Sequence, residues 1–227
     1  MVYYGIKISR YEWCEMSGTK ITDWDLYYRK PFLTAALLRQ HTSGRLIRAL
    51  KKYAGLHRDQ PLRILEFGGG NSSFAHAVTA NFNCMQYCVA DTNQNSISLF
   101  QQQNLPCPAN GVVHDVLTSF PDHNFDLVFS AGLIEHFSLK NTAIAIQNHF
   151  DALKPGGIAA FLFPADSILY RTVRNLAEWT GQWRFPDERP LTAHEVKSAA
   201  NGHTLIHEEW IRCILLTQML MIFRKDV

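Results

Sequence analysis

Three consecutive glycines follow a short apolar run, and this part of the sequence predicts a ligand site most clearly. Residues 64–73 read ILEFGGGNSS, in which Gly68, Gly69 and Gly70 separate a predicted buried strand from a predicted helix. Glycines let a backbone approach a ligand closely, and the first turn of a helix offers free N–H donors. When the segment is aligned to GxGxxG, Ser73 stands where the third glycine belongs, so it matches the dinucleotide fingerprint poorly.

Two carboxylates accompany these glycines, and their charge indicates the kind of ligand. Glu66 lies two residues before Gly68. A carboxylate there is unfavourable to a diphosphate but favourable to the ammonium and sulfonium of S-adenosylmethionine, because opposite charges attract strongly where water is partly excluded. Asp91 follows the apolar run 87–90, at the distance where nucleotide-binding α/β folds place an acid on the ribose hydroxyls. The charges therefore favour a methyl donor over NAD.

Short apolar runs alternate with helical patterns from residue 62 onward, which predicts βαβ units around a mostly parallel sheet. The predicted strands are Leu62–Phe67, Met85–Ala90, Val112–Val113, Phe125–Ser130 and Ile158–Phe163. The predicted helices are Ser72–Ala80, Asn95–Gln103, Leu139–Leu153, Ala165–Trp179 and Thr192–Ala200. The segment 154–157, KPGG, should end the third helix, because proline cannot continue a helix and glycine accepts the positive φ of a cap. The last apolar stretches, 203–211 and 216–223, suit an antiparallel hairpin.

The N-terminal part differs in charge from the rest. Residues 1–60 carry 11 basic and 5 acidic residues, whereas the whole chain has a net charge of only +2. A solvated basic helix face explains this asymmetry more simply than a site for an anionic partner. Two short helices are predicted, Pro31–Gln40 and Gly44–Tyr53, with Ser43 as a candidate cap. We expect residues 1–60 to form a helical extension or lid and residues 61–227 one domain, with 164–201 as an insertion on the acceptor side.

Composition excludes several classes of protein. A chain of 227 residues with 47% hydrophobic and 19% charged residues can bury the core of one domain. Its five cysteines form no CxxC pair, which favours reduced thiols in a cytoplasmic protein and predicts no metal site. The longest apolar stretch, 211–223, is interrupted by Arg212, Thr217 and Gln218, so no transmembrane segment and no signal peptide are expected.

These motifs together resemble the class I S-adenosylmethionine-dependent methyltransferases, particularly the type 11 group. ILEFGGGNS resembles their first motif, VADTN the acidic end of their second strand, HDVLTSFPDHNFDLVFSAGLIEHF their third and fourth strands, and LKPGG the turn before strand five. The matches run in the family's order from residue 62 to 163. The resemblance implies a Rossmann-like α/β fold with a mostly parallel seven-stranded sheet, a C-terminal antiparallel hairpin and an N-terminal helical extension. S-adenosylmethionine is the implied cofactor.

The resemblance also implies roles for individual residues. Glu66, Gly68, Gly69 and Gly70 would hold the methionine end of the donor, Asp91 the ribose, Asp115 the adenine amino group with Val116 stacking nearby, and Ser130 and Ala131 would pass beside the sulfonium. Ser72 stands where the family has its third glycine, although it can still cap the next helix. Gly69 replaces a residue that is often Cys or Ser. Asp115 has an alternative role as the cap of a short helix that follows it.

Methyl transfer to a hydroxyl is an in-line displacement in which the acceptor must also lose its proton. His136 is the first candidate base, and Glu135 the second. A Glu-His pair is common at this point in the family with different acceptors, so an orienting or structural role remains open for both. His114 is a more distant candidate.

Aromatic and basic residues flank the predicted domain core and could bind an acceptor. They are Tyr27, Tyr28, Arg29, Tyr170, Arg171, Arg174, Trp179, Trp183 and Arg184. Such residues could hold a sugar, an aromatic acid or a phosphate-bearing acceptor, although for each a packed or solvent-exposed position is the simpler role.

The sequence predicts methyl transfer from S-adenosylmethionine to a small-molecule or glycan acceptor, with O-methylation slightly preferred. GGGNS resembles the first motif of methyltransferases from bacterial polysaccharide pathways, which points to a saccharide hydroxyl. Two alternatives are an NAD-dependent oxidoreductase and a non-catalytic protein that binds the donor or holds nucleic acid through its basic N-terminus. Nucleic acid is disfavoured, because no binding motif is recognisable and the pI is only about 8.3.

Overall fold

The computed structural model describes residues 22–29, 33–57, 59–213 and 216–226. The strands are β1 (Pro61–Phe67), β2 (Asn83–Asp91), β3 (Ala109–Val113), β4 (Phe125–Ala131), β5 (Leu153–Pro164), β6 (Thr204–Cys213) and β7 (Leu216–Arg224). The helices are α2 (Trp24–Arg29), α3 (Leu33–Ala49), α4 (Ala75–Asn81), α5 (Gln94–Phe100), α6 (Leu139–Ala152), α7 (Ile168–Trp179) and α8 (Ala193–Ala199), with short helical turns η1 (Leu50–Ala54) and η2 (Ile134–His136).

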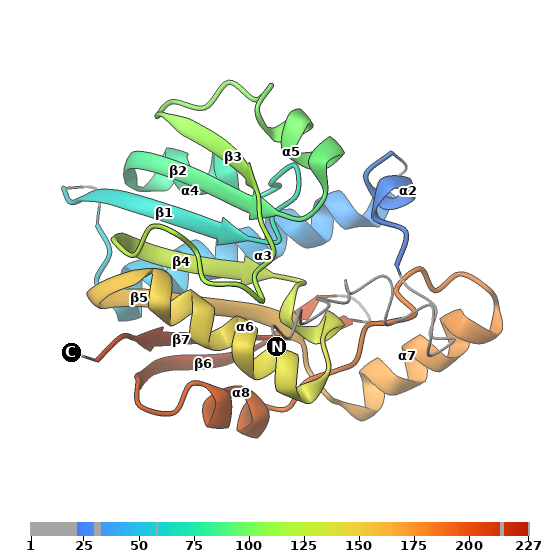
Figure 1. Ribbon diagram of the computed structural model, residues 1–227. Coiled ribbons are helices and arrows are strands. Elements are labelled where there is room, and N and C mark those ends of the chain that lie inside the picture. The colour runs from blue at the N-terminus through green and yellow to red at the C-terminus, as the bar shows by residue number, and fades with distance from the viewer. Residues whose placement is uncertain (1–21, 30–32, 58, 214–215, 227) are drawn as a thin grey trace, which may run out of the picture.

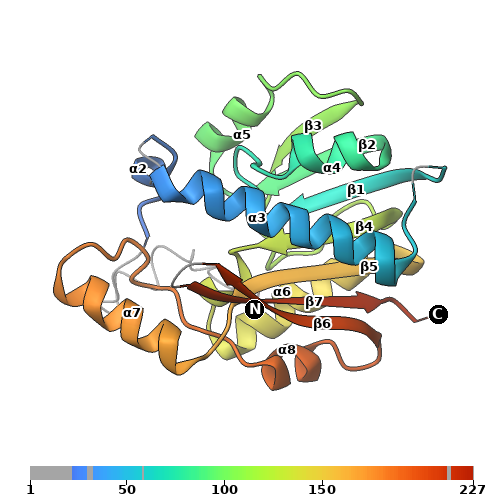
Figure 2. The same cartoon turned by 180° about the vertical axis from the view of Figure 1, so that it is seen from behind.

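The seven strands form one sheet in the order β3-β2-β1-β4-β5-β7-β6. The first five pair in parallel, and β7 joins β5 and β6 antiparallel. Helices cover both faces: α6 lies in front of the sheet in Figure 1, and α3 crosses the opposite face in Figure 2. This is the predicted Rossmann-like methyltransferase architecture, including its C-terminal hairpin.

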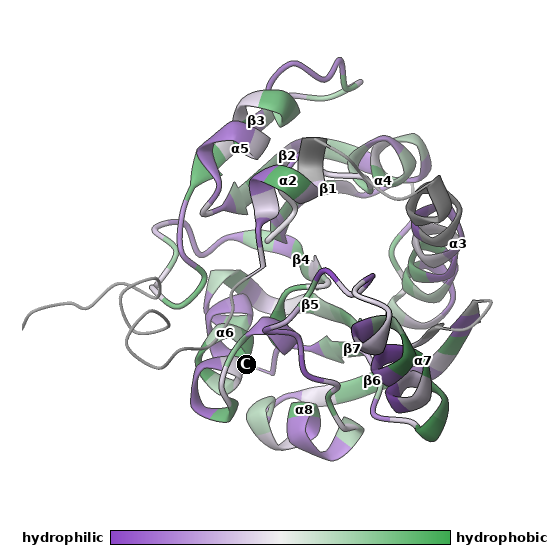
Figure 3. Ribbon diagram, turned by 90° about the vertical axis from the view of Figure 1, so that its right-hand side faces the viewer, coloured by the Kyte–Doolittle hydropathy of each residue, from purple (hydrophilic) through white to green (hydrophobic). Residues whose placement is uncertain are grey.

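Alternation within the strands explains why both faces are covered. In β1, Leu65 and Phe67 point into one hydrophobic core, whereas Leu62 and Ile64 point into the other. The first core lies under α6 and α8, and the second under α3, α4 and α5, as the layers in Figure 3 illustrate. Strands buried on both faces read as nearly continuous apolar runs, which is why the sequence located them well.

The two predicted N-terminal helices are wrong as separate elements. From Leu33 the chain is one helix to Ala49 and continues through η1 to Ala54, while the predicted start at Pro31 lies outside the described residues. Ser43 lies inside α3, where its hydroxyl donates a 3.0 Å hydrogen bond to the carbonyl of Gln40 and caps nothing. Packing of α3 against the sheet overrides the weak break that Ser43 and Gly44 suggested.

The KPGG segment also differs from its predicted role. Helix α6 ends at Ala152, and β5 begins directly afterwards at Leu153. Gly156 has a φ of +74°, but its amide bonds the carbonyl of Lys225, and the amide of Lys225 bonds the carbonyl of Gly157. These glycines therefore extend the sheet toward the end of β7 instead of capping the helix.

The carboxyl ends of the parallel strands meet at one edge of the sheet, where the strand order changes direction between β1 and β4. In open α/β sheets this position is where ligands bind. Helices α2 and α7 lie at the same end of the molecule in Figures 1 and 2. Asp25 of α2 accepts hydrogen bonds of 3.0 and 3.1 Å from Asn93 and Asn95, so α2 is attached to the beginning of α5.

Candidate active site

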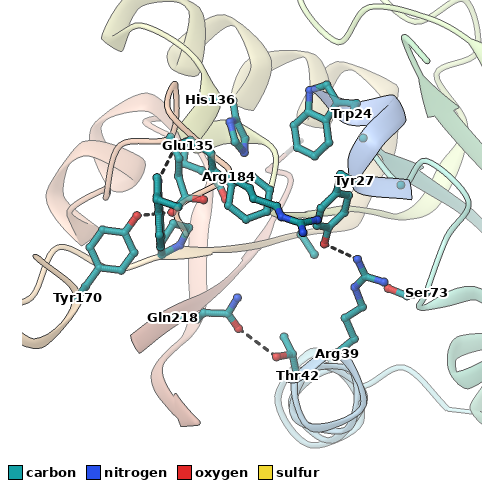
Figure 4. A pocket seen from close by; sticks show the side chains of 18 of the residues that line it. Trp24, Tyr27, Arg39, Thr42, Ser73, Glu135, His136, Tyr170, Arg184 and Gln218 are labelled. Atoms are coloured by element: carbon teal, nitrogen blue, oxygen red, sulfur yellow. Dashed lines mark hydrogen bonds between the residues drawn. The ribbon is translucent and has the colours of Figure 1, made fainter. Parts of the chain in front are cut away.

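A cavity of about 610 Å³ opens at this edge, between the glycine turn and the segment that follows β5. Its lining comes from the glycine turn, the end of β4, α2, α3, β7 and the segment 164–188. Figure 4 shows Arg39 and Thr42 of α3 across the cavity from Glu135 and His136. Six of the predicted site residues line this cavity: Glu66, Gly68, Gly69, Ala131, Glu135 and His136.

The carboxylate of Glu66 is buried beside the glycine turn. Only 2% of the residue is exposed, and its Oε2 accepts hydrogen bonds from the hydroxyls of Ser72 (2.5 Å) and Tyr87 (2.6 Å). Burial raises the pKa of Glu66 to about 7, although both hydrogen bonds oppose this rise. The carboxyl group of Glu66 therefore titrates near neutral pH, and a nearby cation would favour its ionised form.

The glycine turn is shaped around that carboxylate. Gly68 has a φ of +65°, and a Cβ added to Gly69 would lie 2.7 Å from the Cδ of Glu66. Ser72 has a φ of +40°, a conformation that glycine adopts more easily. Its hydroxyl accepts a 3.0 Å hydrogen bond from the amide of Ala75, the first residue of α4, although the N-cap position itself is occupied by Phe74, whose side chain makes no capping hydrogen bond.

Asp91 closes the turn from the neighbouring strand. Its Oδ2 accepts a 2.8 Å hydrogen bond from the amide of Gly70, and its Oδ1 accepts a 2.8 Å bond from the amide of Asn93. Burial raises the pKa of Asp91, and these backbone donors oppose the shift. Asp91 and Gly70 do not line the cavity, but they adjoin the turn that does.

Asp115 and Val116 lie beyond β3, apart from the cavity. Asp115 accepts from the amide of Leu117 within a turn, and no helix follows it, so the helix-cap alternative is wrong. The side chain of Val116 is 5% exposed and packs in the first hydrophobic core. Ser130 is buried at the end of β4, and its hydroxyl finds no hydrogen-bond partner among the described residues.

A second group of ionisable side chains lies on the other wall of the cavity. The Nδ1 of His136 is 3.1 Å from Oδ1 of Asp187, and both side chains are almost completely buried. Because a carboxylate can only accept, Nδ1 carries the proton. Asp187 also accepts from the hydroxyl of Thr22, which fixes its orientation. Burial lowers the pKa of His136, but Asp187 and nearby carboxylates outweigh burial, and the pKa is raised overall.

Glu135 and Glu188 complete this group. The hydroxyl of Tyr170 donates to Oε1 of Glu188, while Oε2 of Glu135 is buried without a hydrogen-bond partner among the described residues. Burial raises the pKa of Glu135 to about 8, with the charge of His136 opposing the shift. Asp187 and Glu188 were missed by the sequence analysis, because they lie in a segment without periodicity. Their only signal was an acidic pair between aromatic and basic residues in 181–190.

Aromatic rings from segments that are distant in the sequence cover one side of the cavity. Trp24 lies edge-on to His136 at 5.1 Å between ring centroids, and Tyr27 meets Phe185 at 5.3 Å. Trp183 lines the same cavity and lies 6.0 Å from the ring of Phe185. Helix α2 thus covers the site together with the segment after α7.

The expected acceptor residues divide into two sets. Tyr27, Tyr170, Trp183 and Arg184 line the cavity, whereas Trp179 is 84% exposed, Arg171 pairs with Asp166, and Arg174 pairs with Glu178. The side chains of Tyr28 and Arg29 lie outside the described residues. The more distant base candidate, His114, contacts the carbonyl of Thr118 and does not line the cavity.

These residues fit S-adenosylmethionine by their chemistry. The turn offers a carboxylate for a cationic group and glycines at which a Cβ would clash with the side chains of Leu133 and Glu66, and a second carboxylate ends the neighbouring strand. A sheet of this order with such a site defines a class I S-adenosylmethionine-dependent methyltransferase. The model of a methyltransferase-domain family matches residues 38–204, and the chain belongs to that family.

Solved structures share the fold. Magnesium protoporphyrin IX methyltransferase from Synechocystis PCC 6803 with bound SAH is 11% identical and has a TM-score of 0.67, with 95% of this chain and 97% of that chain covered. N-methyltransferase NodS from Bradyrhizobium japonicum WM9, in complex with S-adenosyl-l-homocysteine, is 17% identical with a TM-score of 0.60 and covers 96% and 98%. No curated protein matches the chain.

The protein is thus an enzyme that transfers a methyl group from S-adenosylmethionine, which decides against the NAD-dependent oxidoreductase and non-catalytic alternatives. None of the helices described here is both long and apolar enough to cross a membrane.

Proposed function

We propose that the enzyme methylates a hydroxyl group of a small-molecule or saccharide acceptor. The observation that supports this proposal most directly is that one cavity is lined both by the glycine turn with Glu66 and by the ionisable pair Glu135 and His136. The first group suits the methyl donor, and the second suits an acceptor that must lose a proton. The rings of Trp24, Tyr27 and Trp183 support a saccharide, because sugars pack their C–H faces on aromatic rings.

The donor would be held along the carboxyl ends of the parallel strands. Glu66 and the turn of Gly68, Gly69 and Gly70 face the methionine end, and Ser130 and Ala131 follow on β4. Asp91 accepts from the ribose hydroxyls, since its carboxylate retains acceptor capacity beyond the two amides that it already binds. Asp115 holds the adenine amino group, with Val116 below the ring.

When bound, S-adenosylmethionine would supply the methyl group, and its positively charged sulfur would retain the electron pair of the C–S bond that breaks. The protein aligns the hydroxyl and removes its proton. His136 is oriented by Asp187, and Glu135 lies beside it with a free oxygen. These two residues are the groups placed to hold and deprotonate the acceptor.

The N-terminal part would act as a lid over the acceptor. Helix α2 reaches the cavity through Trp24 and Tyr27, whereas α3 is anchored in the core through Leu46 and Leu50. We therefore assign the covering role to α2, within the predicted 1–60 extension or lid, and treat residues 164–201 as the acceptor-side insertion. Cys84, Cys88 and Cys107 are free thiols, which supports a cytoplasmic location.

The test is a screen with S-adenosylmethionine labelled on the methyl group. Nucleotide sugars, free saccharides, glycan termini, phenols, amines and RNA are incubated separately with the enzyme, and the methylated atom is located by mass spectrometry and NMR. Label on a saccharide or other small-molecule hydroxyl supports the proposal. Transfer only to amines, or only to RNA, would overturn the acceptor class while leaving the methyltransferase activity intact.

A further inference from the structure

The strongest unused feature is a buried cluster on the acceptor wall of the cavity, formed by Glu135, His136 and Glu188. Each offers one ligand atom, and the three atoms all lie within 4.8 Å of one another. Two carboxylates and one imidazole on adjoining segments are a ligand set that divalent transition metals accept. The sequence predicted no metal site, because Glu188 is 52 residues from His136 along the chain.

An unsatisfied atom distinguishes this cluster from an ordinary group of acidic side chains. Oε2 of Glu135 is buried and accepts no hydrogen bond from any described residue, while Glu135 as a whole is 2% exposed. A buried carboxylate oxygen without a partner is costly, so such an atom calls for a ligand. The cavity adjoins it, because Glu135 is one of the lining residues.

The surrounding contacts arrange the three residues as ligands. Asp187 accepts a hydrogen bond from Nδ1–H of His136, so Nε2 is the ring nitrogen that would coordinate the cation. A carboxylate behind a histidine is the usual second layer of a metal site, where it fixes the ring and raises its basicity. Tyr170 similarly donates to Oε1 of Glu188 and leaves the other carboxylate oxygen for a ligand.

Two nearby arginines form their ion pairs with carboxylates outside the cluster. Arg174 pairs with Glu178 and donates to the main-chain carbonyl of Glu188, and Arg189 pairs with Glu195. Neither guanidinium forms an ion pair with the carboxylates of the cluster. The positive charge of His136 acts on both Glu135 and Glu188, and that of Arg174 also acts on Glu188.

We propose that Glu135, His136 and Glu188 bind a first-row divalent cation, such as Mn²⁺ or Zn²⁺, at the acceptor end of the cavity. Ligand atoms about 2.1 Å from one cation can be at most about 4.2 Å apart, so the present spacing requires only a small inward movement of the side chains. Three protein ligands leave coordination positions open toward the cavity.

This inference rests on the proposed function and deepens it. An open metal position suits two neighbouring hydroxyls of a saccharide, which would bind as a chelate. The cation would lower the pKa of the attacking hydroxyl, and its proton would leave to solvent water. Glu135 and His136 would then act on the acceptor through the cation instead of receiving the proton themselves.

The test uses the full chain after dialysis against EDTA and removal of the chelator. Mn²⁺ is titrated in and followed by electron paramagnetic resonance, in which the six-line signal of free Mn²⁺ disappears on binding. We expect one bound ion per chain, displaced by Zn²⁺. Glu188→Gln should weaken binding at least about tenfold, and Asp187→Asn about 10- to 100-fold through the orientation of His136.

Glu208→Gln is the matched control, because Glu208 of β6 pairs with Lys197 of α8 and does not line the cavity. It should bind Mn²⁺ as the wild type does, and circular dichroism checks the fold of every variant. Absence of Mn²⁺ binding at millimolar concentration would overturn the proposal, as would equal affinity in wild type and a folded Glu188→Gln protein.

The two proposals fail separately. Methyl transfer to a saccharide at full rate in EDTA would remove the catalytic role of the cation while leaving the acceptor class in place. One tightly bound Mn²⁺ in a protein that methylates only amines would support the metal site and remove the acceptor class. Calorimetric binding of S-adenosylhomocysteine in EDTA verifies that the donor site is intact in either case.

Discussion

The hydroxyl of Tyr87 donates a 2.6 Å hydrogen bond to the carboxylate of Glu66 across two neighbouring parallel strands. Tyr87 is completely buried, as expected for an aromatic residue of the core, but its hydroxyl also contacts the glycine turn through Glu66. Together with Ser72, it holds the carboxylate against the glycine turn and limits the rise of its pKa. A residue that does not line the cavity therefore favours the ionised form of Glu66 against the effect of burial.

Donor binding should depend on pH through Glu66. Because the pKa is about 7 and a cationic ligand requires the ionised form, affinity for S-adenosylmethionine should rise about tenfold from pH 6 to pH 8. Tyr87→Phe removes a hydrogen bond that lowers this pKa, so the midpoint should move to higher pH by about one unit. Calorimetric titrations across this range measure both effects. An affinity independent of pH would show that Glu66 does not face the cationic group.

Gly69→Ala should reduce donor affinity at least about tenfold, because the new Cβ lies 2.7 Å from the Cδ of Glu66 and displaces the carboxylate. Gly44→Ala is the matched control, since Gly44 lies in α3 with no atom within 4 Å of an added Cβ. That variant should keep the affinity and gain about 0.5–1 kcal/mol of stability. Affinity and melting temperature are measured on both proteins. Equal affinities would show that the turn tolerates a side chain.

Asp91→Ala should lower affinity for S-adenosylhomocysteine by about 10- to 100-fold, because a hydrogen bond to a charged group contributes about 1.5–3 kcal/mol. Asp122→Ala provides a comparison, because Asp122 pairs with Arg63 near the amino end of β1 and should affect stability alone. Calorimetry distinguishes the two variants. Unchanged binding in a folded Asp91→Ala protein would place the ribose elsewhere.

His149 should make the protein less stable in acid. The centroid of its ring lies 4.8 Å from that of Phe67 and 4.9 Å from that of Phe161, and burial lowers the pKa of His149 to about 4. Its stabilising contribution is present above the unfolded pKa of about 6.5 and is lost as the pH falls toward 4, because the unfolded chain binds the proton first. The loss is about 2 kcal/mol between pH 7 and pH 5.

Urea denaturation of the wild type and His149→Leu at both pH values measures this loss. Other groups titrate equally in the two proteins, so the difference between their pH dependences isolates His149. The variant should lose about 2 kcal/mol less than the wild type over that range. Parallel curves would show that His149 is protonated in the folded protein.

Most of the fold could be predicted because its determinants are local. The apolar runs of β1, β2, β4 and β5 are continuous in the sequence, and Glu66 and Asp91 stand at strand ends that parallel pairing brings to one edge. The continuity of α3 could not be read in the same way. Ser43 and Gly44 are ordinary signals of a helix boundary, and only packing of the whole helix on the sheet removes that boundary.

The acceptor wall was predicted only in part, for a different reason. His136 and Glu135 follow a strong strand pattern, but Asp187 and Glu188 lie in a segment whose position depends on tertiary contacts alone. The amide of Arg189 bonds the carbonyl of Glu135, which brings this segment against η2. No periodicity in 181–190 encodes that contact, so the partners of His136 could be found only in three dimensions.

The last prediction concerns the pair His136 and Asp187, whose Nδ1 and Oδ1 are 3.1 Å apart. His136→Gln should reduce kcat by about 10²- to 10⁴-fold without changing affinity for S-adenosylhomocysteine, whether the imidazole holds the acceptor directly or through a cation. Asp187→Asn should reduce kcat less. Because Asp187 acts through the imidazole, Asp187→Asn should lower kcat almost no further when it is added to His136→Gln. His114→Gln, at a histidine outside the cavity, should leave kcat unchanged. Full additivity of the two substitutions in the methyl-transfer assay would show that Asp187 and His136 act independently, and the orientation of the imidazole by Asp187 would then be irrelevant to turnover.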